Sequence, residues 1–172
     1  MPSRRIGQSF RQTLIRTDKR LRAELAGALE TTGGKLKRMH EDVVRGWEHQ
    51  PRFLVETRLT TTLLSATVKP DMRRRREALI WIYVNYGTKP HVIRPRKPGG
   101  KLKFQTGYSA KTAPGAAYNV GDGKARGDWV QKDSVNHPGT EARGFTGTFT
   151  KQVKPEFDRN VENAIRRAIR RA

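Results

Sequence analysis

The side chains that could carry catalysis or hold a metal are few in this sequence and widely spaced. The four histidines, His40, His49, His91 and His137, include no pair at the spacing that places two ligands on one face of a helix. Cysteine is absent, which excludes thiolate ligands, cysteine nucleophiles and disulfides. The serines lack a nucleophile-elbow pattern, and the carboxylates are scattered rather than paired. The sequence therefore predicts no enzyme, no metal site and no cofactor.

The residues that stand out chemically are basic. Among 172 residues, 36 Lys and Arg against 16 Asp and Glu give a net charge of +20. Such a surplus attracts polyanions, so nucleic acid, an acidic protein surface and an anionic membrane are the partner classes that it allows. The longest purely apolar stretch, residues 78–84, is far shorter than the ~20 residues that cross a bilayer. Polar residues follow Arg4 and Arg5 where an export signal needs apolar ones. We expect neither a membrane protein nor an exported one.

Two groups of basic residues are candidate contacts for DNA or for an acidic partner. They are Arg73, Arg74, Arg75 and Arg76 and, further along the chain, Arg94, Arg96, Lys101 and Lys103. The first group could bind phosphates through salt-dependent contacts, or it could form the solvated tip of a hairpin. Lys101 and Lys103 could equally protect the edge of a sheet against aggregation. A third group, within residues 166–171, lies near a predicted helix C-terminus, where the helix dipole accounts for cations without any ligand.

A long apolar stripe predicts that residues 1–50 form an N-terminal helix. Apolar residues from Leu14 to Trp47 recur with a period near 3.6, and basic residues occupy the opposite face. Gly33-Gly34 interrupts this pattern at a cost of about 1 kcal/mol per glycine relative to alanine. Because the stripe stays in phase across the two glycines, we expect one long helix, with a kink allowed there, rather than two helices. Pro51 ends it.

Residues 52–143 predict an antiparallel sheet of about five to six strands with one flexible insertion. Residues 79–86 are apolar on both alternating faces, which predicts a central strand packed on two sides. Residues 107–127 are rich in Gly and Ala and have too few large apolar side chains to offset their ordering entropy, so they are expected to form the insertion. The composition and turn signals place strands at 53–58, 59–69, 79–86, 91–94, 101–104 and 128–135.

Residues 144–172 predict a C-terminal amphipathic helix. Apolar residues recur every fourth position from Phe145 to Ile169, so the apolar stripe winds slowly around a helix of 3.6 residues per turn. We expect its best-defined part to run from Pro155 to Arg171, because proline suits the first turn of a helix, with a kinked turn or two before it. The chain as a whole, 1–172, is expected to be a single α+β domain whose C-terminal helix packs on the sheet.

Four short motifs follow one another in the second half of the chain. They are Tyr86-Gly87-Thr88 at the end of a hydrophobic segment, Ile93-Arg94-Pro95-Arg96, Leu102-Lys103-Phe104, and Val135-Asn136-His137-Pro138-Gly139-Thr140 followed by Arg143 and Phe145. In this order, with a long helix before them and an amphipathic helix after them, they resemble the head–tail joining, or tail-completion, proteins of tailed bacteriophages, including the minor tail protein Z type. The resemblance covers roughly residues 79–169.

The resemblance implies a structural protein that assembles and turns over no substrate. Members of this family sit as a ring in the neck of the virion and tie the tail tube to the DNA-filled head. The expected partners are further copies of the chain, neighbouring neck and tail proteins such as a stopper, a tail terminator or the tube, and genomic DNA that passes through the ring without sequence-specific contacts. No membrane partner is expected. The expected location is the virion neck or tail, after synthesis in the cytoplasm of the bacterial host.

The motif residues have structural roles in this interpretation. Gly87 and Gly139 supply backbone conformations that a side chain would strain, and Pro95 and Pro138 stop ladder pairing. Subunit contacts are expected from the sheet edge, the C-terminal helix and residues 107–127, with six-fold or three-fold ring symmetry. The alternative that composition allows is a free basic nucleic-acid-binding protein, associated with chromatin or ribosomes.

Overall fold

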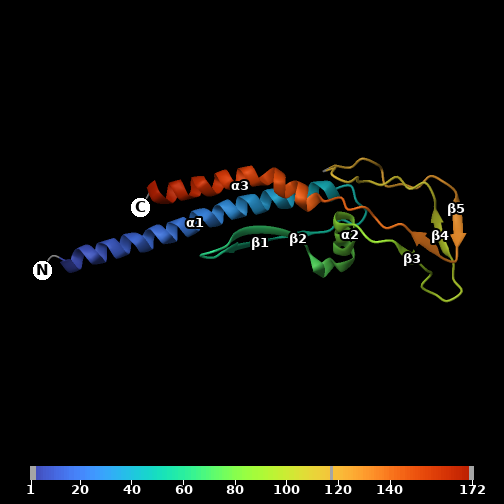
Figure 1. The fold of residues 1–172 in the computed structure, drawn as a ribbon, viewed down its shortest axis with the longest axis horizontal. Coiled ribbons are helices and arrows are strands. Elements are labelled where there is room, and N and C mark those ends of the chain that lie inside the picture. The colour runs from blue at the N-terminus through green and yellow to red at the C-terminus, as the bar shows by residue number, and fades with distance from the viewer. Residues whose placement is uncertain (1–2, 117, 171–172) are drawn as a thin grey trace. The chain divides into compact units, whose positions relative to one another are not determined.

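The computed structural model describes residues 3–116 and 118–170, which form two compact units (Figure 1). The first unit contains residues up to 39, residues 53–69, and residues from 150 onward; the second contains residues 40–52 and 70–149. Two long helices, α1 (Ser3–Val44) and α3 (Phe145–Arg170), contribute residues to both units. No helix in the described part of the chain is both long and apolar enough to cross a membrane.

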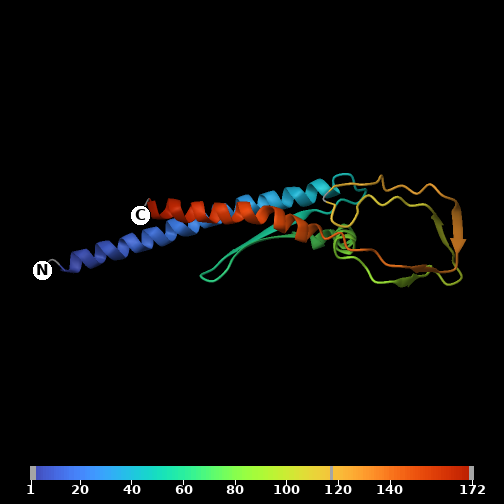
Figure 2. The same ribbon diagram turned by 45° about the horizontal axis from the view of Figure 1, so that its top comes forward.

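The first unit packs a β-hairpin against the two long helices. β1 (Phe53–Leu59) and β2 (Leu64–Pro70) form a two-stranded sheet, and the turn between them is closed by the Thr60 N–H donating to the Leu63 carbonyl (2.8 Å). Figures 1 and 2 both show α3 beside α1 in this unit. Ion pairs join the two helices, Lys35 with Glu156 and Arg167 with Glu24. The buried apolar core of the unit comes from α1, α3 and β1: Ala28, Leu29, Leu36, Phe53, Val153, Ala164 and Ala168.

The prediction that one helix continues through Gly33-Gly34 is confirmed, and the two glycines differ in what surrounds them. A Cβ on Gly33 would lie 2.4 Å from Cγ1 of Val55 and 3.7 Å from Cβ of Ala66, so both strands of the hairpin approach the helix here. A Cβ on Gly34 would meet only the guanidinium end of Arg38, at 3.8 Å. Gly33 is therefore required by close packing, whereas Gly34 is not.

Helix α3 differs from the prediction in where Pro155 lies. Proline was expected in the first turn, but the helix begins at Phe145 and contains Pro155 in its interior. An interior proline lacks the N–H that would bond the carbonyl four residues earlier, at a cost of about 3 kcal/mol. Buried side chains on both sides of it, Val153 and Ala164, hold the helix against the unit and offset this cost.

The second unit contains a short helix where the sequence predicted a central strand. Residues 79–86 belong to α2 (Arg75–Tyr86), which follows the short 3-10 helix η1 (Met72–Arg74). The most deeply buried residues of α2, Ala78, Trp81 and Asn85, are spaced three and four apart, as on one face of a helix. The prediction was wrong because apolar side chains surround this helix, and a continuous apolar run does not distinguish a buried helix from a buried strand.

The strands of the second unit form two separate ladders. β3 (His91–Ile93) pairs antiparallel with β6 (Val135–His137), and β4 (Leu102–Gln105) pairs antiparallel with β5 (Trp129–Lys132). The predicted single sheet of five to six strands is therefore wrong in arrangement: the described residues contain three two-stranded sheets. The predicted strand 128–135 divides into β5 and the start of β6. The α+β fold class is confirmed, including the long N-terminal helix and the C-terminal helix on a small sheet.

Residues 107–127 contain no helix or strand among those described, but their two arms contact each other. Tyr108 and Ala125 form an isolated antiparallel bridge, and the Ser109 N–H donates to the Lys124 carbonyl (2.9 Å). Further in, the Val120 N–H donates to the Lys111 carbonyl (2.7 Å). The insertion thus extends the β4–β5 pair as a loosely bonded loop, and its flexibility stays a prediction.

Candidate functional site

The structure joins two of the sequence motifs that lie about fifty residues apart. Thr88 and Thr140 exchange backbone hydrogen bonds, with N···O distances of 2.9 and 3.1 Å, and the Thr140 N–H also lies 3.0 Å from the Thr88 hydroxyl oxygen. The end of α2 and the turn after β6 are thereby fixed to each other. We call the residues around this pair, 84–91 and 137–146, the motif junction.

The two motif glycines each make room for the opposite segment at the motif junction. Gly87 has φ +77°, and a Cβ on it would lie 2.5 Å from the Thr140 carbonyl oxygen. Gly139 has φ +92°, and a Cβ on it would lie 2.3 Å from the Thr88 carbonyl oxygen. Both conformations and both contacts exclude a side chain. The structural role expected of these glycines therefore has a direct geometric cause.

The motif junction also holds the start of α3. The Arg143 N–H donates to the Val84 carbonyl and the Gly144 N–H to the Asn85 carbonyl, each at 3.0 Å. The buried Asn85 side chain accepts a hydrogen bond from the Thr146 N–H through Oδ1 (3.1 Å), which satisfies one of the free donors at the helix N-terminus. Phe145 is buried beside it and stacks on Phe149, with ring centroids 6.2 Å apart.

Asn85 is a residue of the junction that sequence reasoning did not place in the site. The available signal was a polar side chain directly after the apolar run 78–84. If Asn85 is buried with that run, its amide needs hydrogen-bond partners, which marks it as a residue that joins segments. The strand interpretation hid this signal, since an alternating strand would have turned Asn85 toward solvent or toward a neighbouring strand.

The motif histidine His137 faces a second histidine, His91, across β3 and β6. His91 is the register partner of His137, and their rings stack with centroids 5.0 Å apart. The Nδ1 of His91 lies 2.9 Å from the Lys89 carbonyl oxygen, so it carries a proton and donates. The Nδ1 of His137 accepts from the Gly139 N–H (3.0 Å), so in the neutral ring the proton is on Nε2. The hydrogen bond from the Gly139 N–H fixes the turn at this glycine. Because Nε2 of the neutral His137 ring then carries the proton, this nitrogen is poorly suited to bind a metal.

The remaining motif residues do not take part in the hydrogen bonds of the motif junction: Tyr86 and Pro138 lie within its residue ranges, and the others lie outside them. Tyr86 is exposed and meets Trp81 edge-to-face, and Ile93 is exposed on β3. Leu102 and Phe104 lie on one face of β4, opposite Lys132 and Val130, and both are half-buried. Pro95 is half-buried, and Pro138 is exposed. The described residues contain no group of three or more His, Cys, Asp or Glu that could hold a metal.

The first basic group is held by acids of the same chain. Arg73–Arg76 lie in η1 and the first turn of α2, so the alternative of a hairpin tip is wrong. The Arg73 guanidinium donates to both carboxylate oxygens of Asp71 (2.7–3.1 Å), and Arg74 lies 3.7 Å from the carboxylate of Glu77. Hydrogen bonding from Arg73 lowers the pKa of Asp71 from its ordinary 3.8 to about 2. Two of the four arginines are therefore already neutralised locally.

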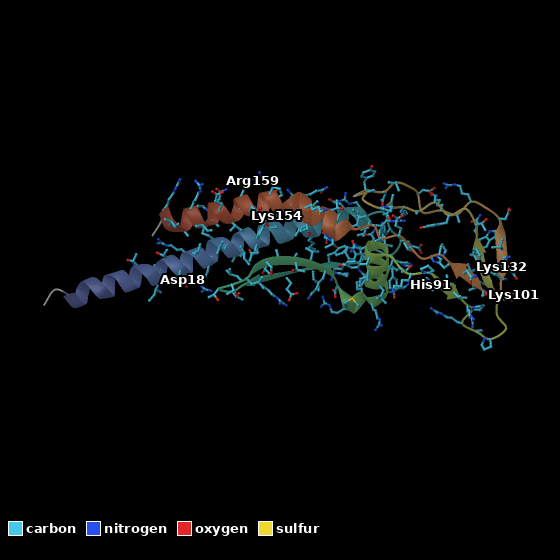
Figure 3. All side chains as sticks on the ribbon, in the orientation of Figure 1. Asp18, His91, Lys101, Lys132, Lys154 and Arg159 are labelled. Carbon is cyan, nitrogen blue, oxygen red and sulfur yellow. The ribbon has the colours of Figure 1, made fainter. Side chains whose placement is uncertain are left out.

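The second basic group is larger than predicted and has almost no acidic neighbours. There is no Asp or Glu between Glu77 and Asp122. Ile93 pairs with Val135 and Leu102 pairs with Lys132, so the connection 94–101 begins and ends beside the short link between β5 and β6. Figure 3 shows Lys101 and Lys132 close together in this region. We call the six exposed cations gathered here the basic cluster: Arg94, Arg96, Lys97, Lys101, Lys103 and Lys132.

Lys97 and Lys132 were missed by sequence reasoning. Lys97 stands beside Arg96 and was available as a signal, whereas Lys132 joins the cluster only through the β4–β5 register. Among the described residues, Lys101 is the one member with an ion pair, 3.1 Å from Asp133.

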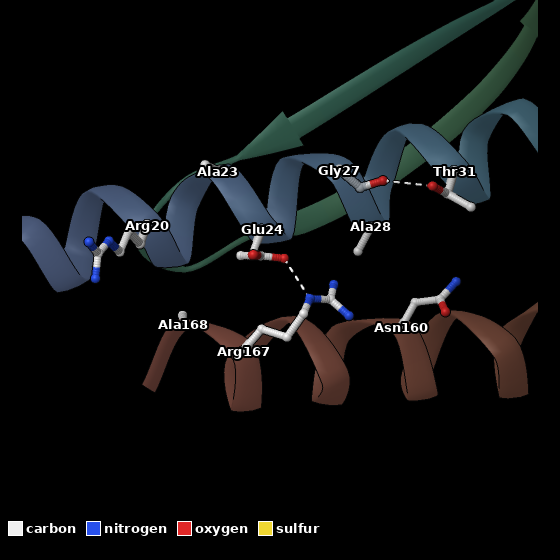
Figure 4. Close-up of a pocket in the computed structure, with 9 residues that line it drawn as sticks. All are labelled: Arg20, Ala23, Glu24, Gly27, Ala28, Thr31, Asn160, Arg167 and Ala168. Atoms are coloured by element: carbon white, nitrogen blue, oxygen red, sulfur yellow. Dashed lines mark hydrogen bonds and ion pairs between the residues drawn. The ribbon is translucent and has the colours of Figure 1, made fainter. Parts of the chain in front are cut away.

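The first unit contributes a separate groove of about 640 Å³ between α1 and α3 (Figure 4). Small side chains, including Ala23, Gly27 and Ala28 on α1 and Ala168 on α3, leave this space open, and the pair of Arg167 with Glu24 (2.7 Å) crosses it. Of the basic groups that the sequence singled out, only the third, within residues 166–171, reaches this groove, through Arg167.

Comparison of the chain with protein-family models, with curated proteins and with solved structures finds no match in any of the three.

Proposed function

We propose that this protein is a structural component of a tailed-phage neck, which forms a ring of identical subunits that joins the tail tube to the DNA-filled head. The order of the four motifs suggests this role. The observation that carries the proposal is the amount of large apolar surface that the second unit exposes to solvent.

Large apolar side chains stand exposed along the ladders, the insertion and the helices η1 and α2 of the second unit. Trp129 is 73% exposed, although aromatic side chains of this size contribute most when buried. So many large apolar side chains exposed in one unit would be covered if neighbouring subunits packed on them, as at a protein–protein interface. The other exposed members in this unit are Met72, Tyr83, Tyr86, Val92, Ile93, Tyr108, Tyr118 and Val120.

The small sheets support the same proposal. Each ladder in the described residues has two strands, so every strand leaves one backbone edge without a strand partner. An isolated two-stranded sheet is marginally stable in water, and further strands or a covering layer stabilise it. Neighbouring copies can supply both by strand addition and by covering the aromatic side chains. Head-to-tail contacts of this kind close into a ring when the rotation between copies allows it.

The motif junction would give each subunit the stiffness that a ring needs. Its hydrogen-bonded turns hold the start of α3 against the end of α2, so these two helix ends should move together. The proposed partners are further copies of the chain, the neighbouring neck and tail proteins, and DNA passing through the ring. The proposed location is the virion.

Electron microscopy of particles made without this protein tests the proposal. We expect separate filled heads and separate tails, and joined virions when the wild-type gene is restored. A rescue with Gly139→Ala, which disrupts the motif junction, should yield fewer joined virions than a rescue with the wild type. Normal virions in the absence of the protein would contradict the proposal.

The second candidate is a free nucleic-acid-binding protein, which the basic cluster favours. It requires a monomer that binds DNA or RNA with micromolar or tighter affinity. Light scattering of the purified chain, alone and with DNA, separates the two candidates, because the neck protein should self-associate and should bind DNA weakly and without sequence preference.

A further inference from the structure

We propose that the basic cluster is the surface of this protein that binds the phosphodiester backbone of nucleic acid, and that Arg73–Arg76 is not. The inference rests on the proposed function for its biological setting, where the ring surrounds DNA. It goes further because the sequence makes both basic groups candidate contacts for DNA, and the structure allows a choice between them.

The difference between the two groups lies in their acidic neighbours. Arg73 is held by two carboxylate oxygens of Asp71, and Arg74 lies near Glu77. Arg73 and Arg74 could neutralise a phosphate only by breaking these ion pairs, so the group keeps two available cations, Arg75 and Arg76, fewer than the basic cluster offers. Arg94, Arg96 and Lys97 have no ion-pair partner in the described part of the chain, and the stretch that contains them has no acidic residue. Their positive charge is therefore available to a polyanion.

The composition of the basic cluster favours nucleic acid over an acidic protein. Protein–protein interfaces are depleted in lysine and place apolar residues at their centre. Four of the six cluster residues are lysines, and all six side chains are exposed. Interfaces with DNA are by contrast strongly positive and polar. Lysine and arginine on a Gly- and Pro-rich turn can follow a phosphate backbone without reading its bases, since phosphate contacts carry no direct sequence information.

Trp129 adds an aromatic surface beside the cluster. It lies opposite Gln105 on β4, on the same face as Lys103 and Gln131, because residues two apart on a strand share a face. Of the cluster, Lys103 shares this face, whereas Lys132 lies on the other one. An exposed aromatic ring beside a cation can stack on an unpaired base. Single-stranded and duplex DNA both present the phosphates that the cluster would bind, and Trp129 would contribute only to the single strand.

The experiment measures binding of fluorescent duplex and single-stranded DNA of mixed sequence to the full-length chain across a range of salt. The cluster variant is Arg94→Gln/Arg96→Gln/Lys97→Gln. The matched control, Arg75→Gln/Arg76→Gln/Lys151→Gln, removes the same charge from exposed cations elsewhere. The logarithm of the DNA-binding constant falls linearly with the logarithm of the salt concentration, and the steepness of this line is the salt slope. It should decrease by about 0.9 for each duplex phosphate that a variant no longer neutralises, hence by about 2–3 in the cluster variant. The control should keep the wild-type slope, and circular dichroism should show both variants folded.

The outcomes separate the sources of phosphate and the competing partner. Loss of single-strand binding alone in Trp129→Ala would identify the single strand as a bound form, while an unchanged Trp129→Ala points to the duplex; both support the assignment. Equal reduction of the slope in the cluster and control variants would overturn it, because binding would then follow net charge alone. Tighter binding of polyglutamate than of DNA at equal salt would also overturn it and indicate an acidic protein partner.

Failure of this inference is distinguishable from failure of the proposed function. If the cluster variant binds DNA normally yet particles without the protein are unjoined, the neck proposal stands and the surface assignment is wrong. If the cluster binds DNA but particles join without the protein, the surface assignment stands and the chain is a free nucleic-acid-binding protein.

Discussion

At the scale of single residues, Gly139 should be the least replaceable glycine of the motif junction. Alanine there must adopt φ +92° and place a Cβ 2.3 Å from the Thr88 carbonyl oxygen. Backbone strain alone costs about 1–3 kcal/mol, and the contact with a carbonyl adds to it. We expect Gly139→Ala to lower the free energy of unfolding, measured by urea denaturation, by at least about 3 kcal/mol.

Gly99 provides the control for this prediction. It also has a positive φ, +70°, but a Cβ on it would meet nothing within 4 Å. Gly99→Ala should therefore show the conformational cost alone, about 1–2 kcal/mol. Equal destabilisation in the two variants would mean that the approach of Thr88 to Gly139 does not matter for stability.

Asp71 should make the stability of the second unit sensitive to acid. Hydrogen bonds from Arg73 lower the pKa of this carboxyl from 3.8 to about 2. An acid whose pKa is lower in the folded state binds its proton less readily than in the unfolded state, so its contribution is fully present above about pH 4. That contribution should be lost as the pH falls from about 4 towards 2.

The Asp71→Asn variant measures this contribution. Thermal unfolding should show the wild type more stable than the variant near neutral pH, with the difference shrinking between about pH 4 and pH 2. Arg73→Gln should reproduce the same pH dependence, because it removes the other partner. Asp71 also caps η1, because its carboxylate accepts a hydrogen bond from the Arg73 backbone N–H (3.1 Å). A difference in stability that is independent of pH would show that this cap, rather than the charge, is what Asp71 supplies.

At the scale of elements, the adjacent glycines of α1 should respond to alanine in opposite directions. Alanine favours a helix by about 1 kcal/mol over glycine. At Gly34 the added Cβ meets only the flexible end of Arg38, so we expect a gain of about 0.5–1 kcal/mol. At Gly33 it would lie 2.4 Å from Val55, and the overlap should cost about 1–3 kcal/mol.

Chemical denaturation of the two single variants decides this prediction, and each is the control for the other. If Gly33→Ala were as stable as Gly34→Ala, the hairpin would not be packed against α1 as closely as the structure indicates.

The elements that the sequence predicts correctly are those whose partners are local. The apolar stripe of α1 repeats over many helical turns, so its period can be recognised from the sequence without knowledge of what the helix packs against. For this reason the helix is correctly predicted to continue across Gly33-Gly34. The segment 79–86 was misassigned because apolar side chains occupy all sides of this helix, the exposed as well as the buried ones, and such a run lacks the periodicity that distinguishes helix from strand. The proline in α3 was misplaced because tertiary packing, rather than propensity, keeps that helix intact.

The sequence predicted which residues belong to the candidate site but not how they are arranged in space. The glycines and prolines of the motifs indicate turns, whereas the hydrogen bonds between Thr88 and Thr140 join positions that only the fold brings together. The same holds for Lys132, which reaches the basic cluster through strand register. The role of Asn85 depends on α2 being a helix, so the error in that element concealed the residue as well.

At the scale of the whole molecule, the net charge of +20 sets two opposite salt dependences. Copies of the chain repel one another, and the Debye length falls from about 30 Å at 0.01 M salt to about 10 Å at 0.1 M, so added salt should promote self-association through the exposed aromatic side chains. Added salt should weaken DNA binding, because released counterions drive it. In a single salt series, self-association should therefore increase while DNA binding decreases.

Sedimentation across a salt series tests the self-association. We expect larger species at higher salt for the wild type and a shift towards monomer in Tyr108→Ser/Tyr118→Ser, which removes two exposed aromatic rings from the insertion. Ile169→Ser, an exposed apolar side chain on α3 in the first unit, is the control and should associate as the wild type does. Association that weakens with salt would mean that charge pairs rather than apolar side chains hold the copies together, and the exposed aromatic surface would then not be the interface.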